Sequence, residues 1–254
     1  MSVLRLFELT GKKALVTGAS RGLGKAMAIA LAQAGCDLAL NARNEGSLGE
    51  TAQAIRKEGR QVCLVAGDVS NEADVKRICE GANQQMGRID VLVNNAGVWE
   101  GSYVIRMQKA DWDRVITTNL TGSFLMAKAA AKIMLKQRSG KIIQVSSILG
   151  LAGGPQSVAY SAAKAGVVQL TRVMAIELGP AGIQVNAIAP GYFKTDMTKQ
   201  YESDPALKAY IDKIPAKRVG EPEDLAGLIV FLASRASDHI TGQVIVIDGG
   251  EILV

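Results

Sequence analysis

The chain has 254 residues, of which 48% are hydrophobic and 21% charged, and both values are ordinary for a folded globular protein. Its formal net charge is +5, but lysine and arginine are scattered among acidic residues without a long basic run, which argues against nucleic-acid binding. The sequence has no transmembrane or signal-peptide pattern, and its three cysteines form no CxxC pair, so we expect a cytoplasmic protein that does not bind membranes.

Short apolar segments alternate with longer amphipathic segments along the whole chain. The predicted strands are Lys13–Thr17, Asp37–Asn41, Gln61–Ala66, Ile89–Asn94, Lys141–Ser146, Gln184–Ala189 and Gln243–Ile247. The predicted helices are Leu23–Ala34, Ser47–Glu58, Glu72–Met86, Lys109–Gln137, Ser157–Leu178 and Glu221–Ala233. Such alternation is typical of a parallel sheet with helices on both faces. We therefore predict an α/β fold, a single doubly wound Rossmann-type domain over residues 1–254 with about seven parallel strands.

A glycine-rich segment, TGASRGLG, joins the first predicted strand to the first predicted helix. Glycines allow a tight turn, and the free N–H groups at the start of a helix attract phosphate. The spacing Gly-x-x-x-Gly-x-Gly differs from the usual Gly-x-Gly-x-x-Gly, and many such turns only join a strand to a helix. We predict that this turn binds a dinucleotide cofactor through Gly18, Ser20, Arg21, Gly22, Leu23 and Gly24.

The end of the second predicted strand selects between NAD and NADP. An acidic residue there would bind the ribose 2′-hydroxyl group of NAD, but the strand continues into Ala42 and Arg43. Unless they are ordinary surface residues, Arg43 and Arg21 can bind a 2′-phosphate through charge-assisted hydrogen bonds, so we predict NADP(H). After the third strand, Asp68 either accepts a hydrogen bond from the adenine amine or caps the next helix.

Tyr160 and Lys164 are four residues apart in a segment with a helical pattern, and Ser147 lies thirteen residues before Tyr160. Because positions i and i+4 share one face of a helix, we expect the ammonium group near the phenol, where it would lower the phenol pKa from about 10. Tyr160 would then act as an acid/base toward an alcohol oxygen. Together with the glycine-rich turn, this pair indicates hydride transfer with a nicotinamide cofactor, although each feature alone has a purely structural explanation.

The segment 191–220 interrupts the alternation of strands and helices. It contains Pro205, Pro215 and mixed charges, and it follows the end of a predicted strand. Ligands of doubly wound folds bind beside the carboxyl ends of the strands. We predict that this segment covers the substrate as a mobile cover; the alternative is a surface excursion without a role in binding.

These motifs together resemble the short-chain dehydrogenase/reductase family. The matching residues occur in the family's order: TGASRGLG, the NNAG motif at Asn94–Gly97, Asn119, Ser147, the pair Tyr160 and Lys164, and the dipeptide Pro190-Gly191. The match extends from about residue 8 to Gly250 and so includes nearly the whole chain. The combination is far more specific than any single motif.

The resemblance implies a role for each matching residue. Tyr160 would be the catalytic acid/base, and Lys164 would lower its pKa and bind the nicotinamide ribose. Ser147 would donate a hydrogen bond to the substrate oxygen, and Asn119 would hold a water that connects to Lys164. Further cofactor contacts are expected from Val69, Asn95, Ala96, Gly97, Pro190, Gly191 and Thr195.

Two subgroups of the family compete for the substrate. The stretch Arg106–Phe124 and the C-terminal segment resemble 3-oxoacyl-[acyl-carrier-protein] reductases, which reduce a β-keto thioester with NADPH. The stretch VNAIAPGYFKTDMTK resembles gluconate 5-dehydrogenases, but those enzymes usually carry a basic residue where this chain has Trp99 and Glu100. Glu100 would repel a substrate carboxylate unless a cation intervened. We therefore prefer a 3-oxoacyl thioester and keep a sugar acid as the alternative.

The resemblance also implies partners. A homotetramer is expected from the family and from the apolar C-terminal segment. Arg138 matches an arginine that the reductases present to the acyl carrier protein, but the second such arginine is replaced by Ala181. A nucleotide-sensing regulator on the same fold is the alternative to an enzyme, and it would be expected to lack the Tyr160–Lys164 pair. With one histidine and no cluster of ligands, neither a metal site nor a Ser-His-Asp hydrolase is expected.

Overall fold

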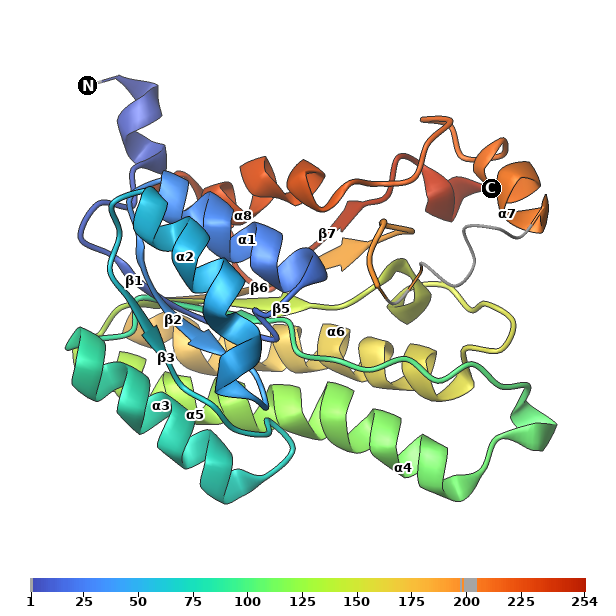
Figure 1. Cartoon of the computed structure of the whole chain (residues 1–254), viewed down its shortest axis with the longest axis horizontal. Helices are drawn as coiled ribbons and strands as arrows, with labels where there is room; N and C mark the ends of the chain where they lie inside the picture. The colour runs from blue at the N-terminus through green and yellow to red at the C-terminus, as the bar shows by residue number, and fades with distance from the viewer. Residues whose placement is uncertain (1, 197, 199–204) are drawn as a thin grey trace.

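Seven parallel strands form one sheet in the computed structural model, which describes residues 2–196, 198 and 205–254 (Figure 1). Their bounds are β1 (Lys13–Thr17), β2 (Asp37–Asn41), β3 (Val62–Leu64), β4 (Val91–Asn94), β5 (Gly140–Val145), β6 (Ile183–Pro190) and β7 (Val244–Ile247). The strand order is β3-β2-β1-β4-β5-β6-β7, so the direction of winding reverses between β1 and β4. The predicted doubly wound α/β fold is confirmed, and its reversal point is where such folds bind ligands.

Helices cover both faces of the sheet (Figure 1). They are α1 (Gly22–Gln33), α2 (Gly49–Lys57), α3 (Glu72–Met86), α4 (Lys109–Ile116), α5 (Gly122–Gln137), α6 (Val158–Leu178), α7 (Pro205–Ile211) and α8 (Ala226–Ala233). One core lies between the sheet and α1, α2 and α8, and the other between the sheet and α3, α5 and α6. Among the described residues, no helix is both long enough and apolar enough to cross a membrane.

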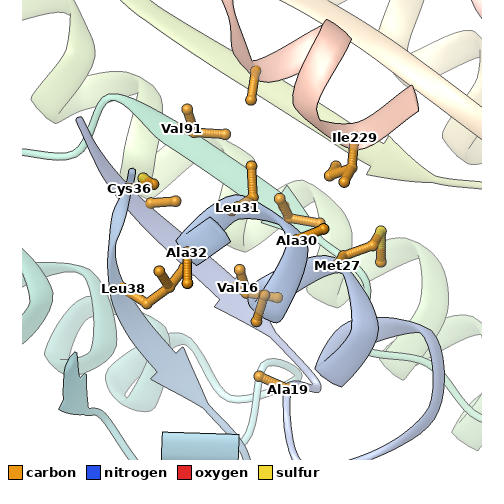
Figure 2. Packing of buried hydrophobic residues seen from close by; sticks show 14 of the residues in the cluster. Val16, Ala19, Met27, Ala30, Leu31, Ala32, Cys36, Leu38, Val91 and Ile229 are labelled. Carbon is orange, nitrogen blue, oxygen red and sulfur yellow. The ribbon is translucent and has the colours of Figure 1, made fainter. Parts of the chain in front are cut away.

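Successive residues of the central strands face opposite cores. Val16 packs on the side of α1, whereas Leu15 packs on the side of α5, and both are fully buried. Figure 2 shows Val16 beneath α1, with Leu31 of α1 and Ile229 of α8 in the same cluster. Burial on both faces explains why these strands are continuous apolar runs in the sequence.

The predicted helix Lys109–Gln137 is three elements, and the prediction of one continuous helix was wrong. A π-helical turn, Thr117–Thr121, separates α4 from α5. Its Asn119 is buried, and Ser123 Oγ donates to the Asn119 carbonyl oxygen at 2.7 Å. Turns of this kind occur frequently at functional sites. The sequence did not predict the turn because its residue types are equally compatible with an ordinary helix.

Most of the other predicted elements differ from the observed ones by one or a few residues at their ends. The strand predicted at Gln61–Ala66 is only β3, although the Val65 amide still donates to the Leu40 carbonyl oxygen at 2.9 Å. The helices predicted from residues 47 and 221 begin as single 3-10 turns, Glu45–Leu48 and Pro222–Leu225, before α2 and α8. These differences move helix and strand ends without changing the topology.

The segment 191–220 runs from β6 toward α8 and contains α7. It returns to its own start, because Phe193 forms a bridge with Gly220. Its start and α7 are attached to the C-terminal residues, because Glu251 accepts hydrogen bonds from the Tyr192 amide at 2.6 Å and from the Tyr210 hydroxyl group. Residues 197 and 199–204 of the predicted cover lie outside the described residues, and covering of the substrate stays a prediction.

Candidate active site

A cavity of about 640 Å³ opens at the carboxyl ends of the strands, and this volume lies in the usual range of ligand sites. Nearly all of the predicted site residues line it. These are Gly18, Ser20, Arg21, Gly22, Leu23, Arg43, Asp68, Val69, Asn95, Ala96, Gly97, Ser147, Tyr160, Lys164, Pro190, Gly191 and Thr195. Two predicted residues, Gly24 and Asn119, do not line the cavity, but each contacts residues that do.

The glycine-rich turn is tight because backbone and side-chain atoms fill the space beside it. Gly18 and Gly22 have φ angles of 63° and 54°, in the left-handed region that favours glycine. A Cβ atom on Gly24 would lie 2.2 Å from the Gly18 carbonyl oxygen. The Asn95 amide nitrogen donates to the carbonyl oxygens of Thr17 and Gly18 at 3.0 and 3.2 Å, which fixes the turn to the end of β4.

Helix α1 begins in this turn without a side-chain cap. No N-cap side chain therefore occupies its first N–H groups, and Gly22 and Leu23 at its start line the cavity, as a phosphate site requires. The residues present thus fit the pyrophosphate of a dinucleotide.

The two arginines predicted to bind a 2′-phosphate line the same cavity as the glycine-rich turn. Arg43 and Arg21 both line the cavity, and Ala42 between β2 and Arg43 leaves no acid at the strand end. The Arg21 side chain is 74% exposed and lies 3.4 Å from the carboxylate of Asp196, in the segment that follows β6. An exposed pair of this length contributes little to stability, so Arg21 can exchange Asp196 for a phosphate at small cost.

Asp68 does not cap the following helix. Its Oδ1 accepts hydrogen bonds from the Ser70 amide at 2.8 Å and the Ser70 hydroxyl group at 2.6 Å, which closes a local turn. Asn71 caps α3 instead, by accepting from the Asp74 amide at 3.0 Å. Asp68 lines the cavity, and its predicted contact with adenine stays a prediction.

Three of the four predicted catalytic residues, Ser147, Tyr160 and Lys164, line the same cavity. Tyr160 and Lys164 lie on the same face of α6, and the Ser147 hydroxyl group, which follows β5, hydrogen-bonds to Tyr160. Ser147 Oγ accepts from the Leu149 amide at 3.1 Å, which leaves its own proton for donation. Lys164 is only 3% exposed, and its ammonium group donates to the Val145 carbonyl oxygen at 2.7 Å.

The predicted lowering of the Tyr160 pKa by Lys164 is wrong for this structure. Burial raises the pKa of Tyr160 to about 12, and the hydrogen bond from Ser147 only partly opposes that effect. Burial also lowers the pKa of Lys164 to about 8. Desolvation penalises the charged form of each group and outweighs their proximity, so Tyr160 is a neutral phenol at neutral pH.

Asn119 holds the loop after β4 in place. Its Oδ1 accepts from the Val98 amide and its Nδ2 donates to the Val98 carbonyl oxygen, both at 2.8 Å. A Cβ atom on Gly97 would lie 3.2 Å from Asn119 Oδ1 and 3.7 Å from Lys164 Nζ, so both groups border this glycine. The predicted water connection between Asn119 and Lys164 stays a prediction.

The cavity wall also contains Trp99, for which the sequence left open a role in an apolar pocket or in packing, and Phe193, within the stretch after β6 that the family resemblance places at the nicotinamide. Arg114, Thr118 and Thr198 line the cavity too, and no role in binding was predicted for them. The Trp99 ring packs edge-on against the Tyr160 ring, with centroids 5.0 Å apart. Arg114 and Thr118 are four residues apart, just before Asn119, and that helical spacing was the only signal in the sequence that pointed to them.

Glu100 is paired with a cation. The Arg114 guanidinium donates to its carboxylate, and Arg114 Nη2 also lies 3.5 Å from Asp111. The sequence alone predicted that Glu100 would repel a substrate carboxylate unless a cation intervened, and it did not identify Arg114 as that cation. The described part of the chain contains no group of three or more His, Cys, Asp or Glu side chains arranged to hold a metal ion.

Comparison with known proteins identifies the family. Residues 18–251 match the family model described as Enoyl-(Acyl carrier protein) reductase. The chain is 44% identical to a 3-oxoacyl-[acyl-carrier-protein] reductase of Synechocystis, over 96% of this chain and 98% of that protein. It is 42% identical to the 2-dehydro-3-deoxy-D-gluconate 5-dehydrogenase of Escherichia coli, over 98% of both.

A solved structure extends the likeness to three dimensions. The gluconate 5-dehydrogenase of Burkholderia cenocepacia, in complex with NADP and tartrate, is 35% identical and covers 100% of both chains with a TM-score of 0.96. The resemblance seen in the motifs is confirmed, and this chain belongs to the short-chain dehydrogenase/reductase family of oxidoreductases.

Proposed function

We propose that this enzyme uses NADPH to reduce a ketone to a secondary alcohol, with a 3-oxoacyl thioester as its preferred substrate. The observation that carries the proposal is the Ser147–Tyr160 hydroxyl pair, which lines the same cavity as a glycine-rich turn that fits a phosphate group. Bound NADPH would supply a hydride to the carbonyl carbon. The side chains of this protein would stabilise the negative charge that develops on the carbonyl oxygen and would donate the proton.

Hydride addition leaves negative charge on the carbonyl oxygen, and that charge needs donors already in place. Ser147 and Tyr160 supply two hydroxyl donors. Because the pKa of Tyr160 is raised to about 12, the phenol is protonated before reaction and can donate its proton to the new alkoxide. Lys164 has further N–H groups beyond the one that binds Val145, and these would hold the cofactor ribose.

The preference for NADP(H) is supported by Arg21 and Arg43 and by the missing acid after β2. The Burkholderia cenocepacia structure, which contains NADP, has the same fold over its full length. A dianionic 2′-phosphate would bind both guanidinium groups, whereas NADH offers them only a hydroxyl group.

The preference for a thioester is supported by the 44% identical reductase and by Trp99 and Phe193 in the cavity wall, which suit an acyl chain. A sugar acid is the second candidate, because Arg114 borders the cavity and two relatives bear gluconate-type names. A regulator without activity is not supported, since the Ser147, Tyr160 and Lys164 side chains meet in one site.

An assay of acetoacetyl thioester reduction and gluconate oxidation, each with both cofactors, tests the proposal. We expect rapid NADPH-dependent reduction of the thioester. Gluconate oxidation without any thioester reduction would overturn the substrate class, and equal rates with NADH would overturn the cofactor preference.

We also propose a homotetramer in a reducing cytoplasm. Exposed apolar side chains on α5 and α6, Phe124, Val173 and Ile176, support subunit contacts, and the three cysteines are free thiols. An acyl carrier protein is a possible partner through Arg138 at the end of α5, although Ala181 weakens that match. Light scattering at micromolar concentration tests the assembly, and a monomer would contradict it.

A further inference from the structure

We propose that Glu100 and Arg114 form a specificity pair, which favours a neutral carbonyl group beside the reacting ketone and excludes a carboxylate at that place. The proposal rests on the proposed function, ketone reduction at Tyr160. It assigns a role to two side chains that the catalytic steps do not use.

Packing between α4 and α6 sets the position of Arg114. Val115 of α4 and the two alanines Ala159 and Ala163 of α6 form a small buried core. Arg114, the neighbour of Val115, lies at the edge of this core and lines the cavity that Tyr160 also lines. Because both side chains line this cavity, the proposal places the ketone of the substrate at Tyr160 and its adjoining group at the guanidinium.

Two attachments fix the loop that carries Glu100. Asn119 binds both backbone groups of Val98 at 2.8 Å, and the Ser102 amide donates to the Gln156 carbonyl oxygen at 2.9 Å, just before α6. Between these points, Trp99 packs on Tyr160 and lines the cavity. Glu100 forms an ion pair with Arg114 but does not line the cavity, so it would offset the positive charge of the guanidinium without contacting the substrate.

The charges around Arg114 do not favour an anion. One guanidinium faces the carboxylate of Glu100 and, at 3.5 Å, that of Asp111, so the group of three carries a net negative charge. A substrate carboxylate placed against Arg114 would meet this excess of negative charge. A guanidinium has five N–H donors, and those not used by Glu100 can still bind a neutral carbonyl oxygen. The pair thus offers hydrogen bonds to a neutral carbonyl group without offering an unpaired positive charge. It selects the neutral group both by attracting it and by repelling a carboxylate.

Two substrates with the same reacting ketone test the pair. Acetoacetyl-N-acetylcysteamine carries a neutral thioester next to its ketone, and acetoacetate carries a carboxylate in that place. We expect the wild-type enzyme to reduce the thioester with NADPH and to reduce acetoacetate poorly. In Glu100→Gln, the amide keeps its shape and a hydrogen bond to Arg114 but loses the negative charge. We expect kcat/KM for acetoacetate to rise about tenfold, and kcat/KM for the thioester to change by less than about threefold.

Three further variants test whether the gain with acetoacetate comes from the lost charge of Glu100 acting through Arg114. Arg114→Ala should raise KM for the thioester, and the double variant Glu100→Gln, Arg114→Ala should lose the gain with acetoacetate, because no cation remains. Asp113→Asn is the matched control: it also removes one negative charge, here from α4, the helix that carries Arg114, but Asp113 pairs with Lys109 at 2.6 Å and does not line the cavity. It should leave the preference unchanged.

The outcomes distinguish the two proposals. If the folded wild-type enzyme reduces neither substrate, the proposed function fails, and the specificity pair fails with it. If it reduces the thioester but Glu100→Gln gains nothing with acetoacetate, or Asp113→Asn gains as much, only the specificity pair is overturned. Comparable reduction of both substrates by the wild-type enzyme would overturn the pair in the same way.

Discussion

The Lys164 ammonium lies 5.4 Å from the centre of the Tyr160 ring and donates its hydrogen bond to the Val145 carbonyl oxygen instead of to the phenol. The two side chains share a helix face, yet the lysine is anchored to the end of β5. The hydroxyl partner of Tyr160 is Ser147. This arrangement favours a protonated phenol that acts as an acid, which is the form needed to reduce a ketone.

Tyr160→Phe should lower kcat for ketone reduction by about 10²- to 10⁴-fold, because it removes the proton donor and leaves the aromatic packing on Trp99. NADPH binding, measured by nucleotide fluorescence, should change little. Tyr103→Phe is the matched control, since Tyr103 is 53% exposed and does not line the cavity. Turnover retained in Tyr160→Phe would remove the phenol from the chemistry.

Lys164 should make stability depend on pH. Burial lowers its pKa to about 8 in the native state, whereas unfolded lysine keeps a pKa near 10.5. Between these values the unfolded chain binds more protons, so the free energy of unfolding should rise with pH; below about pH 8 the penalty of burying the charge is fully present. The rise amounts to about 3 kcal/mol at most.

Lys164→Met should lack this rise. Urea unfolding of both proteins at about pH 7 and about pH 10 measures it, and the advantage of the variant should be greatest at the lower pH. The raised pKa of Tyr160 acts only above about pH 10, where it makes stability fall, and so does not interfere. Parallel pH profiles of the two proteins would show that the native pKa of Lys164 is not lowered.

Arg43→Ala should weaken NADPH binding by about 10- to 100-fold, because a charge-assisted hydrogen bond to the 2′-phosphate contributes about 1.5–3 kcal/mol. NADH lacks that phosphate, and its affinity should change by less than about twofold. Arg56→Ala removes the same charge from the exposed face of α2 and should leave both affinities unchanged. Equal losses of NADPH and NADH affinity in Arg43→Ala would contradict the assigned role.

The sequence was sufficient for features that depend on local pattern. Continuous apolar strands and the glycine spacing predicted the sheet and the cofactor-type turn, and the i,i+4 pair predicted that Tyr160 and Lys164 share a face. Features that depend on packing between distant segments were missed. The Asn119 amide in the π-helical turn binds Val98, 21 residues away, and the pKa of Tyr160 depends on its burial in the folded chain. Neither is visible in a local window.

Gly24→Ala should disrupt the cofactor turn. Its new Cβ atom would lie 2.2 Å from the Gly18 carbonyl oxygen and 2.5 Å from Asn95 Nδ2, so backbone must move. We expect a loss of about 2 kcal/mol or more in the free energy of unfolding and a loss of NADPH binding. Gly227→Ala in α8 is the matched control, because nothing lies within 4 Å of its new Cβ atom. It should be neutral or stabilise by up to about 1 kcal/mol. Thermal unfolding and nucleotide titration of both variants check this, and similar behaviour of the two would contradict it.

The buried Glu251 should position the segment that follows β6. Its carboxylate accepts from the Tyr192 amide at 2.6 Å and from the Tyr210 hydroxyl group of α7. Burial and the Glu251 carboxylate both raise the pKa of Tyr210, so the hydroxyl group remains a donor at neutral pH. Glu251 thus joins the C-terminus to the start of the predicted cover and to α7 within it.

Glu251→Ala removes both acceptors and should raise KM for the ketone about tenfold while changing kcat less, because the cover loses its position but the Ser147–Tyr160 pair does not. Glu251→Gln keeps an acceptor for the Tyr192 amide and should give an intermediate KM, and Tyr210→Phe, which loses only one hydrogen bond, should do the same. Steady-state kinetics of the three variants measure this split. Equal falls in kcat and kcat/KM would place Glu251 in the chemical step, and unchanged kinetics in all three would show that this attachment serves stability alone.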